Sequence, residues 1–182
     1  MIFMKVRNKM NQYISQLKKD GKLNKVLKET QWQFTKKPYI ISGPCSVESE
    51  EMIVYMAKKL KSIGVDALRG GAYKPCTYPI TKTIGNNGWK EGLREEGLKH
   101  LQTAKQETGL PIVSEIMDVR QINNLSMDTI DMIQVGTRNF QNYSLLDELG
   151  QLDKNVLLKR GTWATIDEIL GAVERLLVGG KA

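Results

Sequence analysis

Five short apolar runs alternate with segments of helical periodicity from residue 38 onward, and this alternation limits the folds open to the chain. Short apolar runs bounded by turn residues are typical of buried strands, and strands that alternate with helices form parallel sheets through right-handed crossovers. The pattern therefore predicts an α/β fold, either a doubly wound sheet or a (β/α)8 barrel. We expect strands over residues 39–41, 65–68, 111–114, 130–135 and 156–159, and helices over residues 50–63, 93–108, 119–125, 141–149 and 165–178.

Three helix ends carry recognisable signals. Gly64 and Gly109 follow periodic segments and are expected to stop them. Thr165 is the expected N-cap of the last helix, where Glu168 completes a capping box.

The first 37 residues differ in charge from the rest of the chain. They hold ten Lys and Arg against two Asp and Glu, whereas residues 38–182 hold 17 against 18. We interpret residues 1–37 as a basic helical extension with a solvated face, and residues 38–182 as the β/α domain. A nucleic-acid-binding arm is the competing interpretation, but neither interleaved aromatic residues nor a nucleic-acid motif supports it.

Composition favours an ordinary globular protein, because 41% of the residues are hydrophobic and 26% are charged. No run approaches the roughly 18 apolar residues of a membrane span, and the start lacks a secretory apolar segment. Two cysteines make no disulfide framework. We therefore expect a cytoplasmic protein without a membrane partner.

Cationic residues follow several of the expected strands, where the strands of such folds place their functional loops. Five cations at one mouth imply an anionic ligand, since Arg and Lys bind phosphate and carboxylate groups. The alternative is that some of them pair with Glu115 or Asp131, or point to solvent. The five residues are Arg69, Lys74, Arg138, Lys159 and Arg160.

Motifs at all five strands resemble those of the 3-deoxy-arabino-heptulosonate 7-phosphate (DAHP) synthases, in particular class I enzymes of the simpler β subtype. The resemblance covers roughly residues 38–178, in the family's order and at barrel spacing. The motifs are residues 43–48 (GPCSVE), 68–75 (LRGGAYKP), 109–115 (GLPIVSE), 134–142 (QVGTRNFQN) and 157–161 (LLKRG). The 3-deoxy-manno-octulosonate 8-phosphate synthases share the barrel and come second.

The resemblance implies a TIM-barrel transferase of the shikimate pathway, which makes aromatic amino acids. Such an enzyme joins phosphoenolpyruvate to erythrose 4-phosphate in an aldol-type condensation. In this chain Arg69, Arg138 and Lys159 would hold phosphoenolpyruvate, and Lys74 would sit between the two substrates. Lys74 and Lys159 are the implied catalytic residues.

The resemblance also implies an aldehyde site and a metal. Pro75 and Thr77 would line the erythrose 4-phosphate site, and Cys45 would be one ligand of a divalent ion, Mn²⁺, Fe²⁺, Co²⁺ or Zn²⁺. The motif departs from the family at Cys76, where an arginine that would contact the aldehyde is expected, and in the loop over residues 78–94.

A complete barrel has eight strands and about 250 residues, so we expect a partial barrel of about five β/α units, truncated after the fifth. The implied remaining metal ligands would lie in the missing strands, and His100, in the middle of a helix, is an implausible substitute. We expect a homo-oligomer or a complementing chain to cover the open barrel. Three functions follow: an enzyme, a non-catalytic phosphoenolpyruvate-binding or regulatory remnant, and an octulosonate-type synthase.

Overall fold

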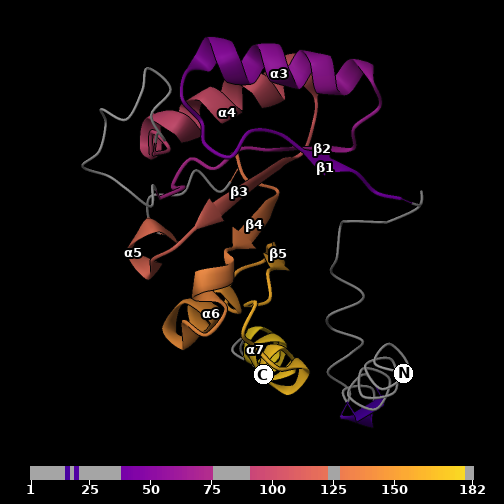
Figure 1. The fold of residues 1–182 in the computed structure, drawn as a ribbon, viewed down its shortest axis with the longest axis vertical. Helices are drawn as coiled ribbons and strands as arrows, with labels where there is room; N and C mark the ends of the chain where they lie inside the picture. The colour runs from indigo at the N-terminus through magenta and orange to yellow at the C-terminus, as the bar shows by residue number, and fades with distance from the viewer. Residues whose placement is uncertain (1–14, 17–18, 21–37, 76–90, 123–127, 179–182) are drawn as a thin grey trace. The chain divides into compact units, whose positions relative to one another are not determined.

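Strands and helices alternate along the chain, as the sequence predicts (Figure 1). The computed structural model describes residues 15–16, 19–20, 38–75, 91–122 and 128–178. The strands are β1 (Ile41–Ser42), β2 (Ala67–Arg69), β3 (Ile112–Ile116), β4 (Met132–Val135) and β5 (Asn155–Leu158). The helices are α3 (Glu50–Ser62), α4 (Glu95–Thr108), α5 (Val119–Ile122), the 3₁₀ turn η1 (Thr137–Asn139), α6 (Tyr143–Leu149) and α7 (Ile166–Val178). The chain divides into two compact units, residues 34–135 and residues 1–33 with 136–182.

The first unit is built on a parallel sheet in which β1, β2, β3 and β4 are neighbours in chain order. Arg69 is aligned with Val113, and Glu115 is aligned with Gln134. Because side chains alternate between the faces of a strand, Arg69, Val113, Glu115 and Gln134 all lie on the same face of the sheet. The register thus places three polar side chains side by side near the carboxyl ends of the strands.

β3 is longer than the sequence pattern indicates. Ser114 and Glu115, expected to end this strand, lie inside it, and β3 continues to Ile116. Gln134 lies within β4, inside the strand expected over residues 130–135. The physical reason is that the pairing of β3 with β4 extends to Ile116 and Val135. The ladder therefore continues beyond Glu115 and Gln134 and keeps both residues inside their strands.

Helices α3 and α4 lie side by side against the sheet (Figure 1). Ser49 caps α3, since its Oγ accepts a hydrogen bond of 3.2 Å from the backbone nitrogen of Met52. Gly64 and Gly109 follow the two helices with φ of 82° and 67°, which confirms both predicted stops. All five residues of β3 are buried, as expected for a parallel strand covered on both faces.

His100 contributes to packing between these helices. Its Nδ1 lies 3.2 Å from Oε2 of Glu50 on α3, and Thr103 donates to the same oxygen over 3.2 Å. The histidine is therefore a helix-packing residue, as expected.

The second unit contains β5, α6 and α7. Its buried core comprises Phe140, Leu145, Leu146, Leu149 and Ala172. The capping box at α7 is confirmed: the Glu168 nitrogen donates to Thr165 Oγ1 over 3.2 Å, and the Thr165 nitrogen donates to Glu168 Oε2 over 2.7 Å. The Thr165 hydroxyl also donates to Glu168 Oε2 over 2.9 Å, and the bonds from the Thr165 backbone nitrogen and hydroxyl lower the pKa of Glu168.

The proposed basic extension lies largely outside the described residues. Of residues 1–37, the structure describes Ser15, Gln16, Lys19 and Asp20, and the Asp20 nitrogen donates to the Gln16 carbonyl over 3.0 Å. The boundary at residue 37 stays a prediction. In the described part of the chain, no helix is long and apolar enough to cross a lipid bilayer.

Candidate active site

Arg69 is the anchor of the candidate site in the first unit. It is the last residue of β2, and its side chain is 16% exposed. Its Nη1 donates to the carbonyl oxygens of Pro44 and Cys45 over 2.8 and 2.6 Å, and its Nη2 donates to Glu115 Oε2 over 3.3 Å. The guanidinium is therefore fixed by the loop that follows β1 and by a carboxylate on β3.

Glu115 holds this arginine from a buried position. The residue is 5% exposed, and its Oε2 also accepts a hydrogen bond of 2.8 Å from Nε2 of Gln134, which is 4% exposed. A buried carboxylate is tolerated when it is paired and hydrogen-bonded. Gln134 and Arg69 meet that requirement together, so β2, β3 and β4 each contribute one member of a connected polar group.

Arg69 keeps donors for a ligand. A guanidinium has five N–H groups, and the three bonds to Pro44, Cys45 and Glu115 use three of them. The Nε–H and one Nη2–H have no acceptor within the described residues. A planar pair of donors suits an oxyanion, because arginine binds carboxylate and phosphate groups in a bidentate manner.

Two glycines allow the loop after β1 to approach Arg69. A Cβ on Gly43, whose φ is 153°, would overlap the carbonyl oxygen of Arg69, and one on Gly71 would come within 2.5 Å of the Cys45 carbonyl oxygen. The Val47 nitrogen donates to the Gly71 carbonyl over 3.1 Å. The glycines of the GPCS and RGG motifs thus let two backbone segments pack directly on each other.

Lys74 and Pro75 line an open cavity of about 380 Å³ at the ends of β2 and β3. Tyr73 at its edge donates to Glu95 Oε1 over 3.1 Å. Burial is the larger cause and this hydrogen bond the second cause that raise the pKa of Tyr73 to about 12. Glu95 lines the cavity as well, and the other lining residues are Glu91, Gly92, Arg94, Met117, Asp118, Arg120 and Gln121. Thr77, the other predicted aldehyde contact, and Cys76 lie outside the described residues.

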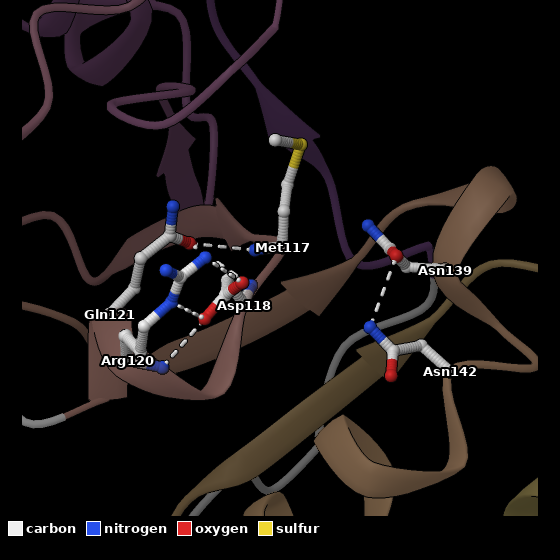
Figure 2. Close-up of polar contacts among 6 residues, drawn as sticks. All are labelled: Met117, Asp118, Arg120, Gln121, Asn139 and Asn142. Atoms are coloured by element: carbon white, nitrogen blue, oxygen red, sulfur yellow. Dashed lines mark hydrogen bonds and ion pairs between the residues drawn. The ribbon is translucent and has the colours of Figure 1, made fainter.

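Figure 2 shows the polar contacts among Met117, Asp118, Arg120 and Gln121, four residues that line this cavity. Arg120 Nε and Nη2 donate to Asp118 Oδ1 and Oδ2 over 2.9 and 2.8 Å, a bidentate pair. Gln121 Oε1 accepts from the backbone nitrogens of Met117 and Asp118 over 2.8 and 3.3 Å. Arg120 is thus already neutralised by its own loop.

The Asp118–Arg120 pair makes a titration prediction. The hydrogen bonds from Arg120 lower the pKa of Asp118 to about 2. A carboxyl-detected NMR titration is expected to show Asp118 half-protonated near that pH, and Arg120→Gln should move the midpoint up toward the ordinary value of about 3.9. The pair stabilises the loop above that ordinary value, and its contribution is lost as the pH falls through the lowered pKa. An unchanged midpoint in Arg120→Gln would show that the pair does not form.

The second unit carries the other three predicted cations. Arg138 is exposed on η1, Lys159 is exposed directly after β5, and the Arg160 guanidinium donates to the Ala164 carbonyl. Within the first unit the structure brings Arg69 close to the loop of Cys45 and places Lys74 in the cavity. The expected convergence of all five cations spans both units and stays a prediction.

Cys45 is a free, exposed cysteine whose carbonyl, rather than its thiol, is used by Arg69. Within the described residues, no group of three or more His, Cys, Asp and Glu side chains is placed to hold a metal ion. Protein sites usually draw on three or four ligands. The described residues therefore do not form a complete site for the implied divalent ion, although Cys45 remains its predicted ligand.

Glu115 was an expected alternative partner of the cations, and the structure pairs it with Arg69, whereas Gln134 and the two backbone carbonyls were missed. Gln134 and Glu115 are polar residues inside otherwise apolar strands, a signal that could have marked them as buried partners. The carbonyls of Pro44 and Cys45 carry no side-chain signal. Arg94 was also missed, since only its backbone conformation sets it apart.

Comparison with known proteins gives a consistent set of matches. The model of the DAHP synthetase I family matches residues 32–182. The chain is 41% identical over 142 residues to phospho-2-dehydro-3-deoxyheptonate aldolase from Thermotoga maritima, covering 78% of the chain and 39% of that protein. It is 30% identical over 142 residues to 2-dehydro-3-deoxyphosphooctonate aldolase from Campylobacter jejuni subsp. doylei, covering 78% of the chain and 52% of that protein.

Solved structures agree with these matches. A crystal structure of the Thermotoga maritima aldolase, also called DAHP synthase, aligns with a TM-score of 0.64 at 40% identity, covering 76% of this chain and 37% of that one. A truncated form of the Thermotoga maritima synthase aligns with a TM-score of 0.65 at 38% identity, covering 79% and 48%. The chain thus has the fold of part of a TIM barrel and spans at most about half the length of these relatives.

Proposed function

The chain belongs to the DAHP synthetase I family, and from this premise we propose that its site binds phosphoenolpyruvate and serves the condensation of that ester with erythrose 4-phosphate. The observation that carries the proposal is the fixed guanidinium of Arg69. Glu115 and two backbone carbonyls orient it, and two of its donors have no acceptor among the described residues. Phosphoenolpyruvate offers a carboxylate and a phosphate, both of which suit such donors.

The roles proposed for the other cations follow from the charge of the substrates. Arg69, Arg138 and Lys159 hold the phosphate and carboxylate of phosphoenolpyruvate, and Lys74 lies between the two substrates. The third carbon of phosphoenolpyruvate attacks the aldehyde carbon, water adds at the second carbon, and phosphate leaves. Lys74 and Lys159 are the proposed catalytic residues, because cations placed where negative charge develops stabilise the transition state.

The aldehyde and metal contacts complete the proposal. Pro75 and Thr77 line the aldehyde site, and Cys45 is one ligand of a divalent ion such as Mn²⁺, Fe²⁺, Co²⁺ or Zn²⁺. No reaction step is assigned to the ion, since the described residues do not form a full ligand set. We place the protein in the cytoplasm, with a second copy or a complementing chain covering the site.

Phosphoenolpyruvate binding without turnover is the second candidate function. It is favoured by the incomplete ligand set among the described residues. In this case the anion site works, and the chain is a binding or regulatory module. An octulosonate-type synthase would use the same phosphoenolpyruvate site and would differ from the first proposed function only in the aldehyde substrate.

A coupled assay separates these functions. Consumption of phosphoenolpyruvate is followed at high protein concentration with Mn²⁺ and either erythrose 4-phosphate or arabinose 5-phosphate. Turnover with erythrose 4-phosphate is expected, and a preference for the pentose would indicate the octulosonate activity. Absence of turnover, together with a phosphoenolpyruvate-dependent rise in the melting temperature, would identify the binding module.

A further inference from the structure

We propose that Arg94 binds the phosphate of the aldehyde substrate, in place of the arginine that the family resemblance places where this chain has Cys76. This inference rests on the proposed function and deepens it, because it names a residue that determines which aldehyde the site accepts. Arg94 lines the same cavity as Lys74 and Pro75.

Arg94 adopts a backbone conformation that side chains rarely take. Its φ is 56° and its ψ is −126°, and it is the single non-glycine residue with positive φ among the described residues. Glycine adopts such angles easily, whereas other residues are strained there. Strained residues cluster at functional sites, so the position of this arginine calls for a reason in its side chain.

The surrounding backbone fixes this conformation. The Arg94 nitrogen donates to the Ala72 carbonyl over 2.8 Å, and the Gly92 nitrogen donates to the Lys74 carbonyl over 3.0 Å. A Cβ on Gly92 would overlap the carbonyl oxygens of Gly71 and Ala72. The segment that carries Arg94 is therefore pinned to the segment that carries Lys74, and both side chains are presented to one cavity.

The charges in the cavity leave Arg94 available. Arg120 is neutralised by its bidentate bond to Asp118, and Glu95 accepts the hydrogen bond of Tyr73. Arg94 and Lys74, by contrast, make no side-chain ion pair or hydrogen bond within the described residues. The carboxylates of Glu91 and Glu95 also line the cavity, but no ion pair joins either of them to Arg94 or Lys74 within the described residues, so both cations keep their donors for an anion.

A phosphomonoester suits this pair of cations. Arginine binds phosphate through two parallel hydrogen bonds, and lysine adds a point charge. The cavity volume of about 380 Å³ is within the range of small-molecule sites. The aldehyde of the proposed reaction carries such a phosphate, and the sequence provides no arginine at position 76 to hold it.

The test measures a phosphate ester at this cavity while the phosphoenolpyruvate site is filled. Glycerol 3-phosphate, an unreactive phosphomonoester, is titrated calorimetrically into the full chain in saturating phosphoenolpyruvate. Arg94→Gly is expected to weaken its binding roughly 10- to 100-fold, the usual range for a hydrogen bond to a charged group. Arg94→Lys should lose less, because it keeps the charge.

Matched measurements separate binding from structure. Lys99→Gln removes one positive charge from an exposed position on the same helix and should leave the affinity within about twofold, because exposed charges are screened. Arg94→Gly should also raise the melting temperature, since glycine relieves the strain. A purely structural arginine would instead lower the melting temperature on replacement.

The outcomes distinguish this inference from the proposed function. Equal affinity of wild type and Arg94→Gly for glycerol 3-phosphate would overturn the role of Arg94 and leave phosphoenolpyruvate binding intact. Failure of the wild type to bind glycerol 3-phosphate while it binds phosphoenolpyruvate would do the same. Failure to bind phosphoenolpyruvate would instead overturn the proposed function, whereas Arg94-dependent binding of glycerol 3-phosphate would still support this anion site.

Discussion

Arg69→Ala is expected to weaken phosphoenolpyruvate binding roughly 100-fold or more and to destabilise the fold by about 3–5 kcal/mol. Binding falls because the two free donors of the guanidinium are lost. Stability falls because Glu115, which is 5% exposed, is left as a buried carboxylate with Gln134 as its remaining hydrogen-bond partner among the described residues. Calorimetric titration measures the first effect, and urea unfolding measures the second.

A double variant separates these two effects. Arg69→Met together with Glu115→Gln removes both charges and should recover much of the lost stability, since replacing a buried ion pair by neutral groups is often tolerated. It should not recover phosphoenolpyruvate binding. A double variant that binds phosphoenolpyruvate as well as wild type would show that Arg69 serves structure alone.

Gly43→Ala is expected to destabilise the protein by about 2–4 kcal/mol, from overpacking and backbone strain combined. The added Cβ would overlap the Arg69 carbonyl oxygen, and the φ of Gly43 is 153°. Moving this loop also moves the Pro44 and Cys45 carbonyls that hold the Arg69 guanidinium. Phosphoenolpyruvate affinity should therefore fall together with the urea midpoint.

Gly171→Ala is the matched control for this change. Gly171 lies in α7, and nothing lies within 4 Å of the position of its Cβ. Alanine is favoured over glycine in a helix, so the variant should be more stable by about 0.5–1 kcal/mol with unchanged affinity. A Gly43→Ala protein as stable as wild type would mean that the loop packs differently from the structure.

Much of the fold could be predicted from local signals. Short apolar runs, the glycines after α3 and α4 and the Thr165–Glu168 capping box act through near neighbours in the sequence, and the structure confirms them. The extent of β3 could not be predicted, because Ser114 and Glu115 are kept in the strand by pairing with β4. Pairing between distant strands leaves little trace in a local pattern.

The candidate site was predictable in its cations but not in their arrangement. Arg69 and Lys74 stand in motifs that resemble those of the family, whereas the partners of Arg69 come from the loop after β1 and from β3, and Gln134 on β4 bonds the Glu115 carboxylate. Arg94 could not be recognised, since a left-handed backbone angle is a property of the folded chain. Long-range contacts and backbone strain are thus what the structure adds.

Calorimetric titration of the wild-type chain with phosphoenolpyruvate tests the central claim most directly. We expect saturable binding at one site per chain, weakened by salt because the contacts are ionic, and abolished in Arg69→Met with Glu115→Gln. A dissociation constant of about 1 mM corresponds to a binding free energy of only about 4 kcal/mol. Absence of binding at phosphoenolpyruvate concentrations well above that value would contradict the proposed function.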